Sequence, residues 1–320
     1  MTPRALVTGG NGFVAQWAIR AMLARGWSVT AAGIGPQPTV SVLDEDERAR
    51  VVWRSTDVTR QEQLATVLTA SHPDLVLHLA AISHVPDAMH NPGYAYEVNA
   101  VGTVRLLSEV RRLRDELKLD PVLLIVGSAE QYGRHEKSEM PLAEEAEQRP
   151  VTSYAASKVA QEIAALQSWR SEGTRVVCTR SFNHSGIGHP LRFLLPSLVA
   201  QAIALPKSGG TLLIGNGDTV RDFLHVTDVV DAYLALLERG QAGDVYNVSS
   251  GEGCSVRELA SAVLQRVGVS ADIATDPLRA RPVDVPVLVG NNERLRRVTG
   301  WSARRSRGDI IDDLIHAATR

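Results

Sequence analysis

Residues 4–15 read Arg-Ala-Leu-Val-Thr-Gly-Gly-Asn-Gly-Phe-Val-Ala, and this stretch decides the fold. An apolar run, expected to form a strand over 4–8, leads directly into glycines and then into a helical pattern over 13–25. The spacing Gly-x-x-Gly-x-x-Ala, starting at Gly9, allows a tight turn and a close backbone approach to a pyrophosphate at the helix N-terminus. A plain strand-to-helix turn is the alternative. The residues expected to hold a dinucleotide here are Gly9, Asn11, Gly12, Phe13 and Val14.

The rest of the first half repeats this alternation of short apolar runs and helical patterns. Further strands are expected over 28–32, 51–53, 75–80 and 122–126. Such alternation predicts a parallel sheet with crossover helices, and nearly continuous apolar runs suit strands that are buried on both faces. After about residue 180, glycines and prolines interrupt the pattern, and shorter elements follow. We therefore predict an α/β fold, a Rossmann-type doubly wound parallel sheet with a smaller α/β substrate-binding lobe.

No low-complexity linker separates the two parts, so we expect them to be interleaved. The dinucleotide-binding Rossmann domain is expected over 1–180 plus about 220–250, and the substrate-binding lobe over about 181–219 and 251–320.

The composition excludes several classes of protein. Of 320 residues, 44% are hydrophobic and 22% charged, and Lys+Arg 34 against Asp+Glu 36 gives a net charge of −2. No basic excess indicates a nucleic-acid partner, and no apolar run approaches the ~20 residues of a membrane span. Cys178 and Cys254 form neither a disulfide framework nor a metal-ligand spacing. We expect a cytoplasmic protein that binds no nucleic acid, membrane or catalytic metal.

The end of the expected second strand bears on cofactor choice. An acidic residue there binds the ribose 2′-hydroxyl of NAD, whereas a nearby arginine accepts the 2′-phosphate of NADP. Residues 31–35 read Ala-Ala-Gly-Ile-Gly and contain neither. The missing carboxylate favours NADP(H) slightly over NAD(H). Asp57 and Val58, after the third strand, are expected at the adenine; alternatively, Asp57 begins the next helix.

Tyr154 and Lys158 stand four residues apart at the start of a helical run, which places both on one helix face. An ammonium beside a phenol stabilises the phenolate, so we expect the lysine to lower the tyrosine pKa for proton transfer. An exposed pair is the alternative. Ser128 and Glu130 follow the apolar run 122–126, at the sheet edge where ligands bind. Ser128 is expected to hydrogen-bond the substrate; Glu130 is either a second acid/base or an ordinary loop carboxylate.

Together these motifs resemble the extended short-chain dehydrogenase/reductase family over essentially the whole chain. The resemblance implies that Ser128, Tyr154 and Lys158 are the catalytic set, and that hydride transfer occurs at C4 of a nucleotide-linked hexose. It also implies cofactor contacts from Leu79, Ala80, Ala81 and Asn99, with Asn99 supporting the lysine through its backbone or a water. The matching segments are residues 8–14, 78–81, 99, 102–103, 128, 154, 158 and 221–226.

Within the family, residues 80–85, 180–186 and 279–285 are similar to the GDP-sugar branch of dehydratases and reductases. A GDP-sugar is therefore the expected substrate. Arg221 and Arg281 make sense as forked donors to its diphosphate. As alternatives, Arg221 pairs with Asp218 or Asp222, and Arg281 is a solvated loop residue. The residues that the resemblance places at the substrate are Ser83, His84, Ser128, Asn183, Arg221 and Arg281.

Two chemistries of this branch compete. A reductase delivers hydride to a C4 ketone, whereas a 4,6-dehydratase also eliminates water, for which Glu130 occupies the acid/base position. The segment 183–188 and the length of the chain favour the reductase. A 4-epimerase remains an alternative, and so does a non-catalytic cofactor-binding scaffold or sensor, against which the intact catalytic set argues. By resemblance, a homodimer is expected to pair through helices over 91–117 and 152–171.

Overall fold

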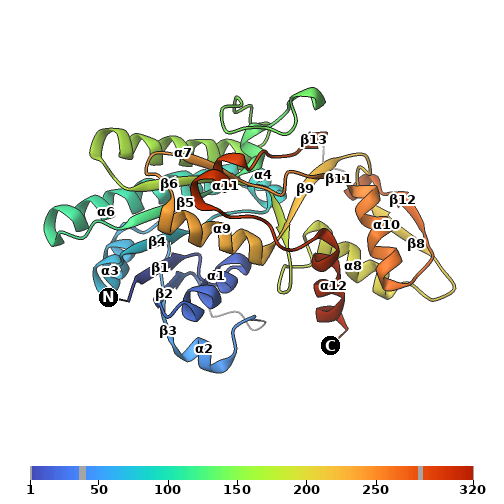
Figure 1. The fold of residues 1–320 in the computed structure, drawn as a ribbon, viewed down its shortest axis with the longest axis horizontal. Helices are drawn as coiled ribbons and strands as arrows, with labels where there is room; N and C mark the ends of the chain where they lie inside the picture. Colours follow the sequence, from blue (N-terminus) through green and yellow to red (C-terminus); the bar gives the residue numbers. More distant parts are fainter. Residues whose placement is uncertain (1, 36–40, 280–283, 320) are drawn as a thin grey trace.

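Seven parallel strands form the central sheet of the protein. The computed structural model describes residues 2–35, 41–279 and 284–319. The spatial order is β10-β6-β5-β4-β1-β2-β3 (Figure 1). The strands are β1 (Arg4–Thr8), β2 (Ser28–Gly33), β3 (Val51–Ser55), β4 (Leu75–His78), β5 (Val122–Ser128), β6 (Val176–Ser181) and β10 (Val245–Val248). The chain order reverses between β1 and β4, and ligands bind at such a reversal. The predicted doubly wound parallel sheet is confirmed.

Helices cover both faces of this sheet because successive strand residues point to opposite sides. Val7 and Leu77 pack with helices α1 and α9 in one buried cluster. Their neighbours Leu6 and Val76 pack with α3, α6 and α7 in another. The helices of this part are α1 (Phe13–Ala24), α2 (Glu45–Ala49), α3 (Gln61–Ser71), α4 (Val85–His90), α5 (Pro92–Tyr96), α6 (Gly102–Leu117), α7 (Ser153–Glu172) and α9 (Val226–Arg239).

The helix expected over 91–117 is interrupted. Between α5 and α6 lies a π-helical turn, Glu97–Val101, and such turns are frequent at functional sites. The helix that carries Tyr154 begins where expected, because the Thr152 side chain accepts a hydrogen bond from the Ala155 N–H. Short 3₁₀ turns, Ala129–Tyr132 and Lys137–Glu139, follow β5.

The second half of the chain builds the lobe at the right of Figure 1. One small sheet has the order β11-β9-β13, with β7 also paired to β9, and β12 pairs with β8. Its strands are β7 (Asn183–Ser185), β8 (Thr211–Ile214), β9 (Val220–His225), β11 (Gly253–Ser255), β12 (Asp272–Thr275) and β13 (Val287–Leu288). Its helices are α8 (Leu194–Ala204), α10 (Val256–Val267) and α12 (Arg307–Ala318), and a 3₁₀ turn covers Pro277–Arg279. Helix α11 (Glu293–Thr299) lies against the central part, beside α9 (Figure 1).

Two segments lie elsewhere than the expected domain boundaries place them. Strand β9, expected with the central sheet, pairs among the described strands with β7, β11 and β13 instead. Conversely, α11 packs against α9 and β10, and Leu295 and Trp301 join the buried cluster around β1. The chain therefore returns to the Rossmann part after residue 290, so the boundary drawn at 251 does not describe this segment.

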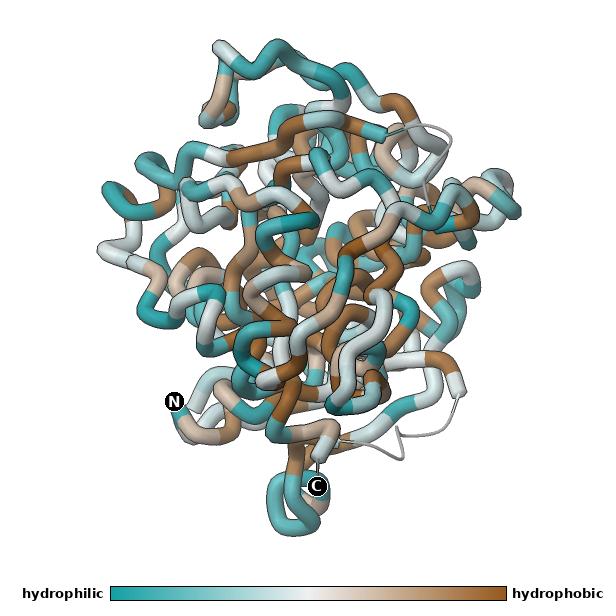
Figure 2. The backbone as a smooth tube through the Cα atoms, turned by 90° about the vertical axis from the view of Figure 1, so that its right-hand side faces the viewer, coloured by the Kyte–Doolittle hydropathy of each residue, from teal (hydrophilic) through white to brown (hydrophobic). Residues whose placement is uncertain are grey.

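Hydrophobic residues concentrate in the middle of the molecule, and hydrophilic residues cover much of the outer surface (Figure 2). Two histidines belong to this interior: His78 bonds Thr8 and Thr103, and His225 bonds Thr227 and Asp313. Cys178 is buried in β6, and both cysteines are free. Within the described ranges, no helix combines the length and apolarity that a membrane crossing needs.

Candidate active site

A cavity of about 610 Å³ lies at the carboxyl ends of the central strands, between the sheet and the lobe. It crosses the reversal between β1 and β4, where a ligand is expected in this architecture. Most of the residues predicted for the site are among those that line it. They are Gly9, Asn11, Gly12, Phe13, Val14, Asp57, Val58, Leu79, Ala80, Ala81, Ser83, His84, Ser128, Glu130, Tyr154, Lys158 and Asn183.

The glycine turn brings the backbone close to this cavity. Gly9 has φ +68°, and a Cβ at this residue would lie 2.8 Å from the backbone nitrogen of Ala80. Gly12 donates its N–H to Gly9 O at 2.8 Å and is the N-cap residue that precedes α1. Among the described residues no side chain caps α1, so the N–H groups of its first turn remain available to an anion. These residues fit the pyrophosphate of a dinucleotide.

Asn11 ties the turn to the second strand. Its side-chain amide donates to the carbonyl oxygens of Ile34 and Gly35, at 3.0 and 3.2 Å. Gly33 and Ile34 line the cavity here, and neither carries a charge. Asp57 makes a local turn, since one carboxylate oxygen accepts from both the N–H and the hydroxyl of Thr59. The same residue also lines the cavity, so its contact with an adenine stays a prediction.

Ser128, Tyr154 and Lys158 meet at the centre of the cavity. Ser128 ends β5, while Tyr154 and Lys158 lie one turn apart on α7, and all three are largely buried. The Lys158 ammonium donates to Val126 O and to Gln161 Oε1, each at 2.8 Å. Glu130 follows Ser128 in the 3₁₀ turn, and its N–H donates to the Ser128 hydroxyl. The Ser128 hydroxyl and the Tyr154 phenol, which hydrogen-bond each other, can both face one substrate oxygen, and Lys158 lines the same cavity.

Burial sets the protonation of this group. It raises the pKa of Tyr154 to about 12; a hydrogen bond with Ser128 opposes the increase, and the Glu130 charge adds to it. Burial also lowers the pKa of Lys158 to about 7. The expectation that the lysine lowers the tyrosine pKa is therefore wrong for this site, because desolvation is the largest effect. Tyr154 is a neutral phenol over the ordinary pH range.

Asn99 lies in the π-helical turn and is fully buried. Its amide receives the Ile82 N–H at 2.8 Å and donates to Ile82 O and to the Ser157 hydroxyl. Ser157 stands between Tyr154 and Lys158 on α7. Asn99 therefore joins the loop after β4 to the helix that carries the tyrosine and the lysine, and it does not line the cavity.

Only some of the residues predicted to bind the substrate line the cavity. Ser83, His84 and Asn183 line the cavity, with His84 Nδ1 3.0 Å from the Asp87 carboxylate. Arg221 does not line it: the side chain is buried, 2.6 Å from Asp284 Oδ1. The partners considered from the sequence, Asp218 and Asp222, are therefore wrong. Arg281 lies outside the described residues.

Asp222, considered above as a partner of Arg221, instead binds backbone and hydroxyl groups of neighbouring loops. Its carboxylate accepts hydrogen bonds from the N–H and the hydroxyl of Ser250, and from the N–H groups of Gly251 and Gly290. It thus fixes the loop before β11 to the strand that carries Arg221.

Comparisons with known proteins agree with this geometry. The sequence matches the model of the family described as GDP-mannose 4,6 dehydratase over residues 6–314. It is 34% identical to GDP-6-deoxy-D-mannose reductase of Pseudomonas aeruginosa, over 94% of this chain and 92% of that protein. It is 30% identical to GDP-6-deoxy-D-talose 4-dehydrogenase of Aggregatibacter actinomycetemcomitans, over 93% and 91%. The structure of RMD from Pseudomonas aeruginosa complexed with NADPH matches with a TM-score of 0.82, at 30% identity over all of both chains.

The chain belongs to the GDP-mannose 4,6-dehydratase family. The resemblance to the nucleotide-sugar branch of the extended short-chain dehydrogenase/reductases is thereby confirmed.

Sequence reasoning missed an aromatic stack among the residues that line the cavity. The His189 ring stacks on Phe13 with ring centroids 4.6 Å apart, and on Phe193 at 4.4 Å. It therefore joins the lobe to the residue after the glycine turn. Ser181 and Tyr233 were also missed; both line the cavity, and their hydroxyl groups are 2.7 Å apart. Only the position of Ser181, at the end of a parallel strand beside Ser128, offered a signal.

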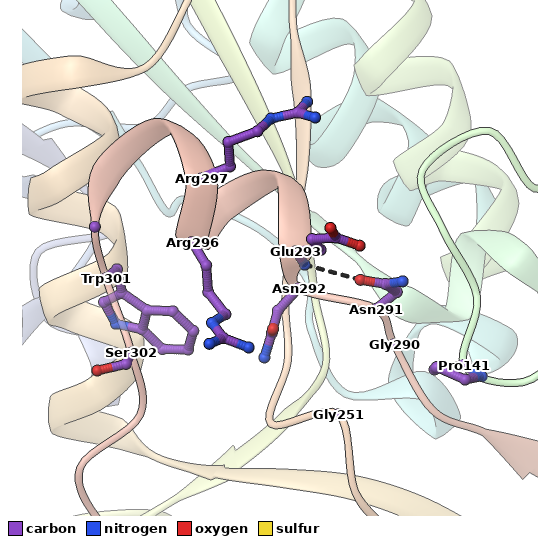
Figure 3. A pocket seen from close by; sticks show the side chains of 11 residues that line it. Pro141, Gly251, Gly290, Asn291, Asn292, Glu293, Arg296, Arg297, Trp301 and Ser302 are labelled. Carbon is purple, nitrogen blue, oxygen red and sulfur yellow. Dashed lines mark hydrogen bonds between the residues drawn. The ribbon is translucent and has the colours of Figure 1, made fainter.

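A second cavity, of about 750 Å³, lies where α11 meets the loops at Gly251 and Gly290. Figure 3 shows Arg296 pointing into it beside Asn292, whereas Arg297 points away on the other side of α11. None of the predicted site residues that the structure describes lines this cavity. Across the described chain, no group of three or more His, Cys, Asp or Glu side chains lies together as metal ligands do.

Proposed function

We propose that the protein is an NADPH-dependent reductase of the C4 ketone of a GDP-4-keto-6-deoxyhexose, forming a GDP-6-deoxy-D-mannose or -talose type product. The observation that carries the proposal is the meeting of Ser128, Tyr154 and Lys158 in one cavity with the glycine turn. The similarity to GDP-6-deoxy-D-mannose reductase supports the choice of sugar.

The cofactor, when bound, supplies the hydride that goes to C4. Tyr154 donates its phenol proton to the C4 oxygen, so the carbonyl becomes an alcohol. A high pKa of Tyr154 suits this direction, because the phenol must hold its proton until the oxygen gains charge. Ser128 donates a hydrogen bond to the same oxygen. Lys158 is proposed to donate a hydrogen bond to a ribose hydroxyl of the cofactor.

NADP(H) is the proposed cofactor. The cavity is lined at the end of β2 by Gly33 and Ile34, so in the described part of this segment no carboxylate repels a 2′-phosphate. The similar structure from Pseudomonas aeruginosa holds NADPH, which supports the same choice. Gly9, Gly12 and Phe13 are proposed at the pyrophosphate, Asp57 and Val58 at the adenine, and Leu79 to Ala81 along the central part.

For the substrate, we propose contacts from Ser83, His84 and Asn183 to the sugar. Arg221 and Arg281 are proposed at the diphosphate. Arg221 is paired with Asp284 and does not line the cavity. To bind the diphosphate, its guanidinium must therefore leave Asp284 or contact both groups at once.

A 4,6-dehydratase is the second candidate, because Glu130 lines the cavity next to Tyr154. A carboxylate in this position can remove the proton at C5 and protonate the leaving hydroxyl at C6.

A cytoplasmic homodimer is the proposed form of the enzyme. Val104 on α6 and Ile163 on α7 are 47% and 59% exposed, and Tyr96, on the preceding helix, is 39% exposed. Helices α6 and α7 pack together, so these side chains lie on neighbouring elements where a second copy could cover them. Light scattering at micromolar concentration tests this form: a dimer mass is expected, and a strict monomer contradicts it.

Mass spectrometry of two incubations tests the function. With GDP-4-keto-6-deoxy-mannose and excess NADPH, we expect the nucleotide-sugar to gain two hydrogens. With GDP-mannose and catalytic cofactor, we expect no change, whereas loss of one water would establish the dehydratase.

A further inference from the structure

A buried polar chain lies behind the proposed catalytic serine. The Ser128 backbone N–H donates to Gln131 Oε1 at 2.8 Å, and Gln131 Nε2 donates to Glu162 Oε2 at 2.8 Å. Gln131 has no exposed surface. The glutamine amide is therefore a bridge between the backbone of β5 and a carboxylate on α7.

The carboxylate at the end of the bridge is itself fixed. Arg180 forks onto Glu162, with Nε 3.0 Å from one oxygen and a terminal nitrogen 2.7 Å from the other. Both side chains are at most 6% exposed, and Gln148 also donates to this carboxylate. Glu162 lies four residues after Lys158, on the helix face that also carries Tyr154. The ion pair therefore lies on the same face of α7 as Tyr154 and Lys158, one helical turn further along.

The charge on Glu162 decides which way the amide of Gln131 points. A carboxylate only accepts hydrogen bonds, so the NH₂ end of the amide must face it. The oxygen end must then face Ser128, whose N–H has this oxygen as its acceptor. The fit is close: a Cβ on Gly127 would lie 2.4 Å from Gln131 Oε1. Stability alone is a poor account of the ion pair, since apolar replacements of buried pairs are often neutral or stabilising.

We propose that Gln131, oriented by Glu162 and Arg180, is a positioning residue that holds Ser128 at the C4 oxygen of the substrate. The proposal rests on the proposed function, in which Ser128 donates to that oxygen. We expect Gln131 to act on the reaction through Ser128, because its amide oxygen accepts from the Ser128 N–H while its amide nitrogen donates to Glu162. Its loss should therefore matter only while the Ser128 hydroxyl is present.

A double-mutant cycle tests this dependence. Gln131→Met keeps the length of the side chain and removes both hydrogen bonds; Ser128→Ala removes the hydroxyl. In the wild-type background, Gln131→Met should lower kcat by about 10- to 100-fold, with KM for NADPH changed less than about twofold. In the Ser128→Ala background, the same substitution should change kcat by less than about twofold. Equal losses in the two backgrounds would show a merely structural effect and overturn the proposal.

Two further variants keep the test decisive. The exchange Gln131→Glu with Glu162→Gln moves the carboxylate to the Ser128 side, where it still accepts the N–H. The kcat of this double variant should be at least about tenfold higher than the kcat of Glu162→Gln alone, in which the Gln131 amide is free to turn. Equal kcat values of the two variants would contradict the proposal, even if Gln131→Met fails to fold. Gln167→Met, on the exposed side of α7, is the matched control and should leave kcat unchanged. If Ser128→Ala alone keeps full turnover, the role of Ser128 in the proposed function fails instead.

Discussion

The ammonium of Lys158 donates a hydrogen bond to Gln161 Oε1, 2.8 Å away and three residues further along α7. It also donates to Val126 O at 2.8 Å. Both partners are neutral, so nothing in these contacts offsets the desolvation of the charge, and the pKa of Lys158 falls to about 7. The lysine is therefore ready to lose or gain a proton near neutral pH before any cofactor binds.

This pKa predicts a pH dependence of stability. Between about pH 7 and the ordinary lysine pKa of about 10.4, the unfolded chain holds a proton on Lys158 that the folded protein has lost. Rising pH therefore favours the folded state in that window, with a slope of at most about 1.4 kcal/mol per pH unit. We expect the free energy of unfolding of the cofactor-free wild type, minus that of Lys158→Met, to increase from pH 7 to 10 in urea titrations. A flat difference would show that the Lys158 pKa is not lowered.

Tyr154→Phe should separate proton transfer from binding. The phenol is the proton donor in the proposed reaction, so its removal is expected to lower kcat by about 100- to 10,000-fold. The ring remains, and the hydrogen bond that the phenol loses among the described residues is the one with Ser128, so NADPH should still bind. Turnover and a fluorescence titration with NADPH check the two parts. Unchanged turnover would contradict the mechanism.

The fold was predictable because its signals are local. The apolar runs and the glycine turn mark strands and helices, and Tyr154 and Lys158 share a helix face by spacing alone. Even the positions of Ser128 and Glu130 follow from the rule that ligands bind at the carboxyl ends of parallel strands.

What sequence reasoning missed depends on contacts between distant segments. Arg221 pairs with Asp284 through the pairing of β9 with β13, which no local pattern encodes. The Tyr154 pKa follows from burial by several elements at once. Trp301 packs in the buried cluster around β1, and Phe13 stacks on His189. Both contacts likewise join residues far apart in the chain.

Gly9→Ala should weaken cofactor binding more than the strain of a positive φ alone would. Gly9 has φ +68°, and an added Cβ would lie within 3 Å of Ala80 and Leu79. Gly26→Ala is the matched control, because Gly26 has φ +76° with nothing near its Cβ. We expect the control to cost about 1 kcal/mol of unfolding free energy and to bind NADPH normally. Gly9→Ala should cost more and weaken NADPH binding at least about tenfold by calorimetry; equal behaviour of the two variants would contradict the close approach.

Glu130→Gln distinguishes the two candidate chemistries. Ketone reduction needs one proton donor, which is Tyr154, so the variant should keep its reductase kcat within about fivefold. Elimination of water needs the carboxylate, so a dehydratase would lose about 100-fold or more. Steady-state assays with the keto sugar and with GDP-mannose measure both, and a large loss of ketone reduction would place Glu130 in the catalytic set.

The central claim is that hydride passes from bound NADPH to C4 of a keto sugar. The most direct measurement uses NADPH that carries deuterium at C4 of the nicotinamide on the transferred face, with GDP-4-keto-6-deoxy-mannose as substrate. The account predicts one deuterium at C4 of the product hexose, located by mass spectrometry and proton NMR, with one NADPH consumed per product. An unlabelled product, or a label at C6, would contradict it.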